Sequence, residues 1–472
     1  MRPDVPVVIV GAGLAGLVTA YELQRVGVPS LVLEENARIG GRVHSVTFAD
    51  GLVAEAHMEE FWEGSPAWAL LDELSLPLEL DYAQSSVVLG GTLYACRGDG
   101  DRAAYLADVF GPDEGDQAAF VDWNARIGAL LTRVEAGDGS LRPLMASDFA
   151  SYVRSTAGSH RVAEWIRVVV ESETAIEWDQ ISALDGIAEM RPFLDRPGHF
   201  GELNAHVVGG NARLVDALVA GLPDGTTLTQ QRVISVRDAG RYCEVQTRCA
   251  DGGTSLVRSE RVVVTTPSWA LPWIALDAPV DAHARAAMDA ARSGRYVKVL
   301  VRARAEAREL WSDQADGLFT LLTDSPAGCV YAGASDDPDA DLVLTLLIHG
   351  HHAVPLNGLP PQTITQRAIA ELEALTVRDR DGGPTRALLP GIGELVTEAR
   401  AYDYPHAVAY WPVAEGRSRF DALADALRRP HGRVHFGGDT TESSHSDGAV
   451  RSALRTARQV SLALGVHAEA AS

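Results

Sequence analysis

The sequence predicts an α/β fold in which a nucleotide-binding domain, assembled from three separated segments, is interleaved with an α+β domain. Two observations predict the nucleotide-binding domain. A buried strand, a glycine-rich turn and a helix open the chain at residues 5–23, and another strand followed by a long helix closes it at residues 433–464. A third observation predicts the interruption, because residues 100–200 carry acidic, alanine-rich stretches with helical spacing.

Length and charge restrict the function before any motif is considered. The chain has 472 residues, too many for one ordinary core, and its net charge of −23 would repel nucleic acid and anionic membranes. Its four cysteines form no C-x-x-C pair, and no signal peptide precedes the first strand. We therefore expect a cytoplasmic protein with a small-molecule substrate, no nucleic-acid partner and no membrane, and we leave a homodimer open.

The first βαβ unit carries a nucleotide-binding motif. Residues 11–16, Gly-Ala-Gly-Leu-Ala-Gly, have the spacing G-x-G-x-x-G, follow the apolar strand 5–10 and open a helix that ends before Gly27. In this Rossmann-like arrangement the glycines let a pyrophosphate approach the helix N-terminus, and an acidic residue after the second strand, 31–33, binds ribose hydroxyls. The expected contacts are Gly11, Gly13, Ala15, Gly16, Glu34 and Glu35.

The later elements follow from periodicity and from turn residues. Residues 363–375 and 448–464 have helical spacing, whereas residues 376–394, rich in Asp, Gly and Pro, predict a surface loop. Short β-branched runs predict further strands at 231–237, 244–247, 261–265, 296–302, 342–348 and 433–436.

Two further motifs select the cofactor. Residues 38–45, Arg-Ile-Gly-Gly-Arg-Val-His-Ser, follow the second strand, and residues 436–439, Phe-Gly-Gly-Asp, precede the Gly-Ala-Val of residues 448–450. These segments resemble the R-x-G-G-R-x-x-[ST], F-x-G-[ED] and G-A-[VI] motifs of the flavin-dependent amine oxidase superfamily. The resemblance covers residues 1–60, 205–300 and 405–465 and implies FAD. Because no cysteine lies near Tyr410 or Asp439, we expect the FAD to be bound noncovalently.

The resemblance implies a role for each motif. Gly40, Gly41 and Arg42 would lie against the flavin diphosphate, and the backbone at Val233 would meet the adenine. The remaining implied contacts are at the ribityl chain and the pyrimidine edge of the flavin, where a helix N-terminus stabilises the anionic reduced form. They come from Gly438, Asp439, Ala449 and Val450.

The same resemblance sets the expected domain boundaries. The FAD-binding domain would comprise residues 1–80, 205–290 and 395–472. Residues 81–204 and 291–394 would form a substrate-binding domain with a helical insertion.

Lys298 is the only lysine among 41 basic residues. An ammonium is more compact than a guanidinium and more easily deprotonated, so the exception marks a position with a special requirement, unless it is a chance survivor on a strand. In the family a strand lysine holds a water against flavin N5, and Lys298 falls at that place. Tyr410 and Trp411 resemble the aromatic segment on the substrate side of the flavin, although an aromatic pair on a strand also suits a core.

The third cofactor segment departs from the family. Where relatives carry a Gly-Gly pair, residues 55–62 bring bulk and carboxylates, with Met58 as an expected cofactor contact. Glu59 and Glu60, and with them Glu63, are candidates to bind a substrate cation or to act as a base, unless they face solvent. His445 stands near the place of an aromatic-cage tyrosine of monoamine oxidases, so we do not expect a simple arylalkylamine as substrate.

The sequence therefore predicts an FAD-dependent oxidase of an amine-type substrate such as a specialised metabolite. Hydride would leave the carbon next to nitrogen, giving an imine, and O2 would be the acceptor, giving H2O2. One alternative is an enzyme like the carotenoid desaturases and protoporphyrinogen oxidases, acting on an apolar substrate; another is a non-catalytic protein like the prenyl-protein dissociation inhibitors. We expect no metal site, because no cysteine or second cluster joins His349, His351 and His352.

Overall fold

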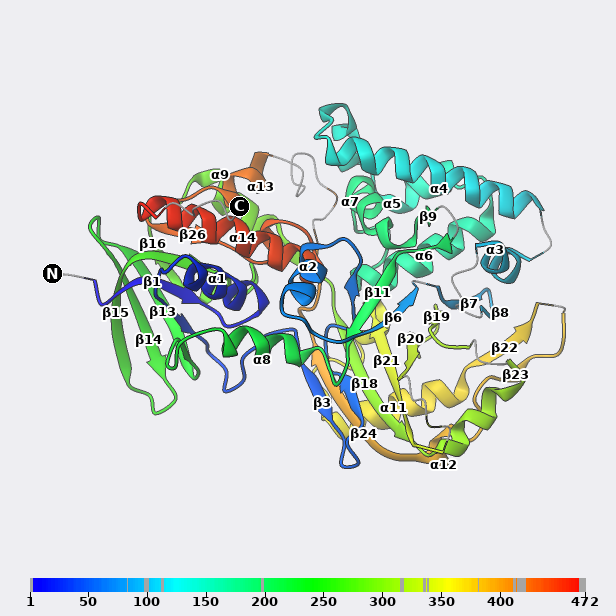
Figure 1. The fold of residues 1–472 in the computed structure, drawn as a ribbon. Coiled ribbons are helices and arrows are strands. Elements are labelled where there is room, and N and C mark those ends of the chain that lie inside the picture. The colour runs from blue at the N-terminus through cyan, green and yellow to red at the C-terminus, as the bar shows by residue number, and fades with distance from the viewer. Residues whose placement is uncertain are drawn as a thin grey trace.

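Two large sheets and a cluster of helices make up the computed structural model, and Figure 1 shows their arrangement. The helices α3–α7 lie above the second sheet, and the first sheet lies at the other end of the view. The structure describes residues 3–82, 84–96, 102–111, 114–196, 199–314, 318–333, 337, 339–380, 382–410, 413 and 422–466.

The first sheet joins strands from three distant parts of the chain, in the order β12-β2-β1-β15-β14-β13-β16, with β26 also paired to β15. Its centre is parallel: β1 pairs with β2 and with β15, and β15 with β26. The strands are β1 (Val5–Val10), β2 (Ser30–Leu33), β12 (Thr227–Leu228), β13 (Gln231–Asp238), β14 (Cys243–Cys249), β15 (Thr254–Val264), β16 (Ala275–Asp277) and β26 (Val434–Phe436). The predicted α/β class is confirmed.

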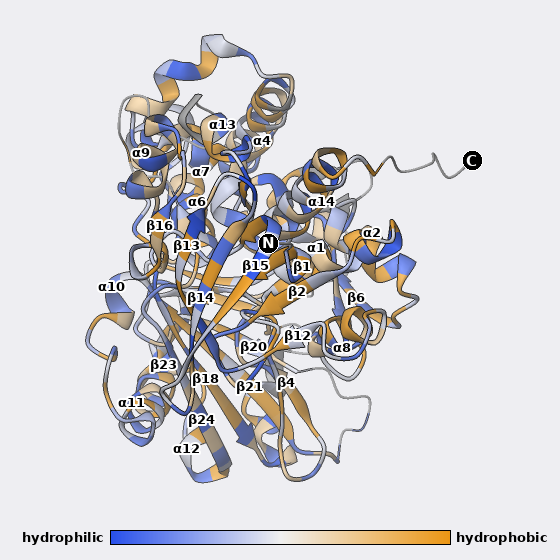
Figure 2. Cartoon of the chain, turned by 90° about the vertical axis from the view of Figure 1, so that its left-hand side faces the viewer, coloured by the Kyte–Doolittle hydropathy of each residue, from blue (hydrophilic) through white to orange (hydrophobic). Residues whose placement is uncertain are grey.

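Three helices cover one face of this sheet and share one core with it. Helix α1 (Leu14–Arg25) packs against α14 (His445–Ala463) and α8 (Ala212–Ala220). At their contact the hydroxyls of Thr19 and Thr456 lie 3.3 Å apart. The strands β1 and β2 are largely apolar, as Figure 2 shows, and so is the buried end of β15 at residues 262–264, because both faces of the sheet are covered there.

The second sheet has the order β23-β22-β8-β7-β19-β20-β21-β18-β24. Its strands are β7 (Ser86–Leu89), β8 (Thr92–Tyr94), β18 (Tyr296–Ala303), β19 (Leu321–Thr323), β20 (Cys329–Ala332), β21 (Leu342–His349), β22 (Thr376–Asp379), β23 (Arg386–Ala387) and β24 (Val396–Tyr404). Helix α11 (Pro361–Ala374) packs against β18 and β24.

The helical cluster confirms the predicted helices between residues 100 and 200. It contains α3 (Arg102–Phe110), α4 (Glu114–Glu135), α5 (Phe149–Thr156), α6 (His160–Thr174) and α7 (Ala183–Glu189), and its core includes the fully buried Trp123 and Phe149. The shorter helices are α2 (Pro66–Glu73), α9 (Ala282–Ala290), α10 (Gly350–Ala353), α12 (Ile392–Leu395) and α13 (Ala422–Arg428). Within the described residues no helix is long and apolar enough to cross a membrane.

Small strand pairs complete the fold. One three-stranded sheet has the order β5-β11-β6, and the pairs are β3 with β4, β9 with β10 and β17 with β25. Their bounds are β3 (Ser45–Thr47), β4 (Val53–Glu55), β5 (Phe61–Trp62), β6 (Leu78–Tyr82), β9 (Asp195–Arg196), β10 (His199–Phe200), β11 (Leu203–Val207), β17 (Arg292–Ser293) and β25 (Ala409–Tyr410).

Three boundaries differ from the sequence prediction by three residues or more. The strand predicted at residues 261–265 begins earlier, at Thr254, where the chain is more polar and exposed. Residues 376–394 are not a continuous surface loop, because β22 adds to the second sheet and buries Val377 completely. The Asp- and Gly-rich stretch that suggested a loop is the connection between β22 and β23. The last helix begins at His445, three residues before the predicted start at Gly448, because its first residues, His445, Ser446 and Asp447, are polar and carry no apolar periodicity. The predicted domain boundaries stay a prediction.

The conformation of the turn between β1 and α1 requires glycine at two positions. Gly11 has φ +101°, a conformation that glycine adopts without strain. A Cβ at Gly16 would lie 2.0 Å from the carbonyl oxygen of Gly11, so the helix can start this close to the strand only with glycine there. The sequence motif is therefore a steric requirement of this fold as well as a feature of nucleotide binding.

We expect Gly16→Ala to lower the free energy of unfolding by about 1–3 kcal/mol, since the added methyl must push the turn away from α1. Gly128→Ala is the matched control, because Gly128 lies inside α4 with no atom near its Cβ position. This control should gain about 0.5–1 kcal/mol from helix propensity. Chemical denaturation measures both, and a Gly16→Ala protein as stable as the parent would contradict the steric argument.

Candidate active site

A cavity of about 540 Å³ is lined by residues of both large sheets and of the helical cluster. Its size is in the range of cofactor and substrate sites. Most of the residues predicted from the sequence line it: Gly11, Gly13, Ala15, Glu34, Glu35, Gly40, Gly41, Arg42, Met58, Glu59, Glu60, Val233, Lys298, Gly438, Asp439 and Ala449.

Two glycine-rich turns meet at one end of the cavity. Gly13 and Gly40 form a bridge, in which the Gly40 amide donates to the carbonyl of Ala12 at 2.7 Å. Gly40 and Gly41 have φ +95° and +58°, and a Cβ at Gly41 would lie 3.1 Å from the Cα of Gly13. Only glycine lets the two backbones approach this closely, so both turns line the same end of the cavity.

Glu34 lies at the end of β2 and is buried. One carboxylate oxygen accepts from the amide of Ala12 at 2.8 Å, and the other accepts from the amide of Asn36 at 2.9 Å. These bonds fix the carboxylate beside the glycine turn. The neighbouring Glu35 is exposed and pairs with Arg232 at 3.4 Å, so the two adjacent glutamates occupy different environments.

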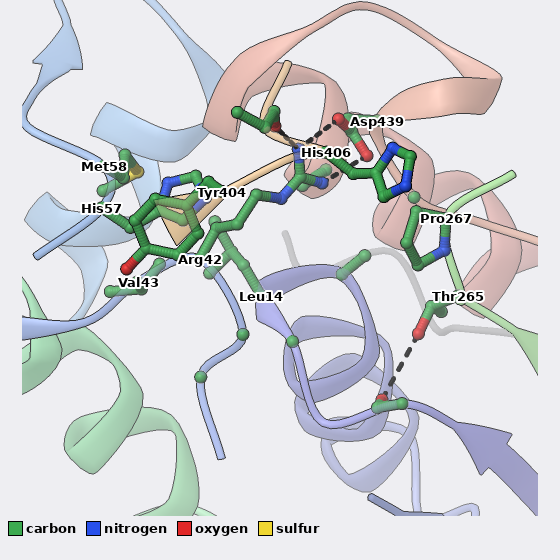
Figure 3. A pocket seen from close by; sticks show the side chains of 18 of the residues that line it. Leu14, Arg42, Val43, His57, Met58, Thr265, Pro267, Tyr404, His406 and Asp439 are labelled. Atoms are coloured by element: carbon green, nitrogen blue, oxygen red, sulfur yellow. Dashed lines mark hydrogen bonds and ion pairs between the residues drawn. The ribbon is translucent and has the colours of Figure 1, made fainter. Parts of the chain in front are cut away.

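Arg42 and Asp439 form a two-point ion pair between positions nearly 400 residues apart, drawn in Figure 3. The Arg42 nitrogens donate to the two Asp439 oxygens at 2.8 and 2.6 Å, and one also donates to the carbonyl of Ala407 at 3.0 Å. Burial opposes the charge of Arg42, but the Asp439 carboxylate outweighs it and raises the pKa of the guanidinium. The pair therefore connects the Arg38–Arg42 turn to the start of the C-terminal segment.

Lys298 lies in the middle of β18 and is completely buried. Its ammonium donates to the carbonyl of His57 at 2.7 Å and forms an ion pair with Glu59 at 2.5 Å. The structure thus brings together two residues that the sequence identified separately.

An aromatic group beside Lys298 was missed by the sequence analysis. The ring of His57 lies 4.2 Å from that of Tyr404 and 5.1 Å from that of Tyr296, whose hydroxyl hydrogen-bonds His57 Nδ1. Burial, with the nearby charges of Arg42 and Lys298, holds the pKa of His57 well below its usual value, so this imidazole is neutral. Alternation along β24 could have suggested Tyr404, but nothing in the sequence places it beside His57.

The part of the cavity wall formed by Glu60 and Glu173 is acidic, and we call it the acidic wall. Glu173 lies on α6, and in the described part of the chain neither carboxylate has a hydrogen-bond or ion-pair partner. Burial, reinforced for Glu60 by Glu173, raises the pKa of Glu60 to about 8, and burial raises that of Glu173 to about 7. Glu173 was missed, because on a helix that supplies core residues a lone glutamate gives no signal of a cavity.

His445 begins α14 at this acidic wall. Its Nε2 lies 3.0 Å from the carboxylate of Glu189, at the end of α7, and its φ is +73°. Such a conformation is strained for a residue with a side chain, and the contact with Glu189 helps to hold it. The sequence flagged His445 by its position but could not predict Glu189.

Some predicted residues lie away from the cavity wall. Gly16 and Val450 are buried in α1 and α14, and Tyr410 is paired through β25 to β17 and packs against the helical core. Trp411 lies outside the described residues. His351 contacts Glu177, and no group of three metal-ligating side chains in the described ranges could hold a metal ion.

Comparison with known proteins identifies the family of this chain. The sequence model of a family described as flavin containing amine oxidoreductase matches residues 14–461. Lysine-specific histone demethylase 1 homolog 2 of Arabidopsis thaliana is 23% identical over 96% of this chain and 58% of its own length. Putrescine oxidase of Kocuria rosea is 26% identical over 50% of this chain and 51% of its own. The chain thus spans little more than half the length of these relatives.

Solved structures share the fold. Cyclohexylamine oxidase from Brevibacterium oxydans superimposes with a TM-score of 0.77 at 20% identity, over 98% of this chain and 100% of that one. Putrescine oxidase bound to putrescine has a TM-score of 0.75 at 20% identity, over 97% and 98%.

A double-mutant cycle on Arg42 and Asp439 tests the pair. Asp439→Asn leaves the Arg42 guanidinium without its counter-charge, and Arg42→Met leaves the buried Asp439 carboxylate without one. The losses in the free energy of unfolding of the two single variants should therefore add up to more than the loss in the double variant. We expect a coupling energy of about 0.5–3 kcal/mol from chemical denaturation. Strictly additive changes would show that the pair contributes nothing to stability.

Proposed function

This chain belongs to the family of flavin-containing amine oxidoreductases, and from that premise we propose that it is an FAD-dependent oxidase. It takes a hydride from the carbon next to the nitrogen of an amine, leaves an imine, and uses O2 as acceptor to give H2O2. The observation that supports this best is the meeting of the two glycine turns, the Arg42–Asp439 pair and Lys298 in one cavity.

The residues present suit FAD. The glycines let the two turns approach each other closely, and the first amides of a helix such as α1 have no partners within the helix and suit a diphosphate. Glu34 would accept ribose hydroxyls and the backbone at Val233 would meet the adenine, and Arg42, Asp439 and Lys298 line the same cavity. When bound, FAD supplies the two-electron acceptor that the reaction needs.

The protein's own side chains orient the amine and exclude water. Tyr296, Tyr404 and Trp62 give the reacting end of the cavity aromatic walls, against which an uncharged amine can pack. The Lys298 ammonium places a fixed positive charge there, where it would stabilise negative charge arising during the reaction with O2.

The acidic wall favours an amine that carries a second cationic group. Glu60 and Glu173 lack partners among the described residues, and a substrate ammonium between them would supply the missing counter-charge. The structural neighbour bound to putrescine holds such a diamine. An apolar desaturase substrate would leave both carboxylates unsatisfied, so we do not favour that alternative, and family membership argues against a non-catalytic binding protein.

The direct test is to purify the protein, identify the flavin and screen amines. The protein should be yellow and should release FAD on acid precipitation, because no described cysteine lines the cavity. Diamines and monoamines should then be assayed for H2O2. A colourless protein that cannot be reconstituted, or one that no amine reduces anaerobically, would overturn the proposal, and reduction by an apolar polyene would favour the desaturase alternative.

A pH series tests the acidic wall. As the pH rises through about 8, Glu60 loses its proton and gains the charge that attracts a second ammonium. The ratio of kcat/KM for a diamine to that for a monoamine of equal length should therefore rise from pH 7 to pH 9, by about tenfold or 1.4 kcal/mol. Using the ratio cancels the ionisation of the reacting amine.

Glu60→Gln should abolish this rise, whereas the control Glu63→Gln, at an exposed position of the same segment, should keep it. A pH-independent ratio in the parent, or an unchanged rise in Glu60→Gln, would remove Glu60 from substrate recognition.

A further inference from the structure

The surroundings of Lys298 are unusual for an ammonium. The residue is 0% exposed, and it lies on β18 between Leu347 of β21 and Tyr402 of β24. A buried charge without a partner is costly, and a buried lysine ordinarily responds by losing its proton. The described structure offers one close carboxylate, that of Glu59 at 2.5 Å.

The contacts of the ammonium do not use all of its donors. An ammonium has three N–H groups. One donates to the carbonyl of His57 at 2.7 Å, whereas the Glu59 carboxylate oxygen, 2.5 Å from Nζ, forms an ion pair without hydrogen-bond geometry. Because Lys298 lines the cavity, a remaining N–H is available to a water or a bound group there.

The segment that carries these two partners is itself held in place. The amide of Met58 donates to the carbonyl of Arg42 at 3.1 Å, and the side-chain amide of Asn211 donates to the carbonyl of Glu59 at 2.6 Å. The segment is thus tied both to the turn that carries Arg42 and to Asn211, at the start of α8. Glu59 is therefore positioned by the backbone and not by the lysine alone.

Glu59 differs from the other titratable groups near Lys298. The other titratable groups facing Lys298 are Glu55, Glu60 and His57 on the same segment and Tyr402 on β24. Burial raises the pKa of Glu55 to about 7 and that of Glu60 to about 8, and the charge of Glu59 adds to both shifts. Glu59 is the carboxylate that contacts the Lys298 ammonium, so it supplies the counter-charge.

We propose that Glu59 is a positioning residue that keeps Lys298 as an ammonium and, with the carbonyl of His57, aims its remaining N–H into the cavity. Glu59 acts through the lysine and does not itself bind the amine. The consequence for the reaction with O2 rests on the proposed function, but the ion pair and its effect on the lysine do not.

The single lysine makes a direct test available. Protein grown with lysine labelled with carbon-13 at Cε gives one signal, that of Lys298, whose chemical shift reports whether the amine is protonated. We expect this signal to lose its proton at a lower pH in Glu59→Gln than in the parent, by about one to three pH units. Glu63→Gln, on the exposed part of the same segment, should match the parent.

This measurement needs neither substrate nor turnover, so it remains valid if the proposed activity fails. Identical titrations of the parent and Glu59→Gln would overturn the proposal. If Glu59→Gln does not fold, Glu59→Asp and the double variant Glu59→Gln/Lys298→Met replace it. The double variant should fold, because both charges are gone, and its failure to fold would show that Glu59 is needed for a reason other than Lys298.

The reaction gives a second readout. In stopped-flow absorbance, reoxidation by O2 in Glu59→Gln should match the parent at low pH and fall about tenfold or more below it at high pH, where the lysine is neutral. Anaerobic reduction by the amine should change much less. With Lys298→Met already present, adding Glu59→Gln should change reoxidation no further, and an equal additional loss would show that Glu59 acts independently.

Discussion

The site depends on the close approach of two backbones at Gly13 and Gly40. Their bridge lets the turn after β1 and the turn after β2 share one space. The second turn carries Arg42, whose pairing with Asp439 brings the C-terminal strand and helix to the same place. Any side chain at Gly41 would separate the turns, so the position of the C-terminal segment depends on glycines near the N-terminus.

The cavity also has a division of charge that the net charge of −23 conceals. Arg42 and Lys298 carry positive charge at one end, each neutralised by one carboxylate. Next to this pair of charges, Glu60, which adjoins Glu59, and Glu173 are paired with no cation in the described structure. A bound group that presents a negative part to Arg42 and a cation to Glu60 and Glu173 would match this arrangement.

The sequence could predict those residues whose role follows from a local pattern, but not those whose role depends on contacts between distant parts of the chain. The glycine turns, Glu34 and Asp439 were predictable, because each lies within a few residues of a strand end whose pattern is visible locally. Glu173 was not predictable, because helical periodicity indicates which side of a helix is buried but not whether that side meets a core or a cavity. The sequence around Tyr410 suited both a core and a cavity wall. In the structure Tyr410 packs against the helical core, and this contact joins segments too far apart in sequence to be predicted.

The segment of residues 55–62 shows how one local departure changes several properties together. Replacing Glu59 and Glu60 with glycine would leave the Lys298 ammonium buried without a counter-charge. It would also remove one of the two carboxylates, those of Glu60 and Glu173, that have no partner in the described structure. Glu59 and Glu60 are adjacent in sequence yet have different surroundings, because one is paired with the lysine and the other lies among carboxylates. Two adjacent glutamates would therefore act on different properties, Glu59 on the charge of Lys298 and Glu60 on the choice of substrate.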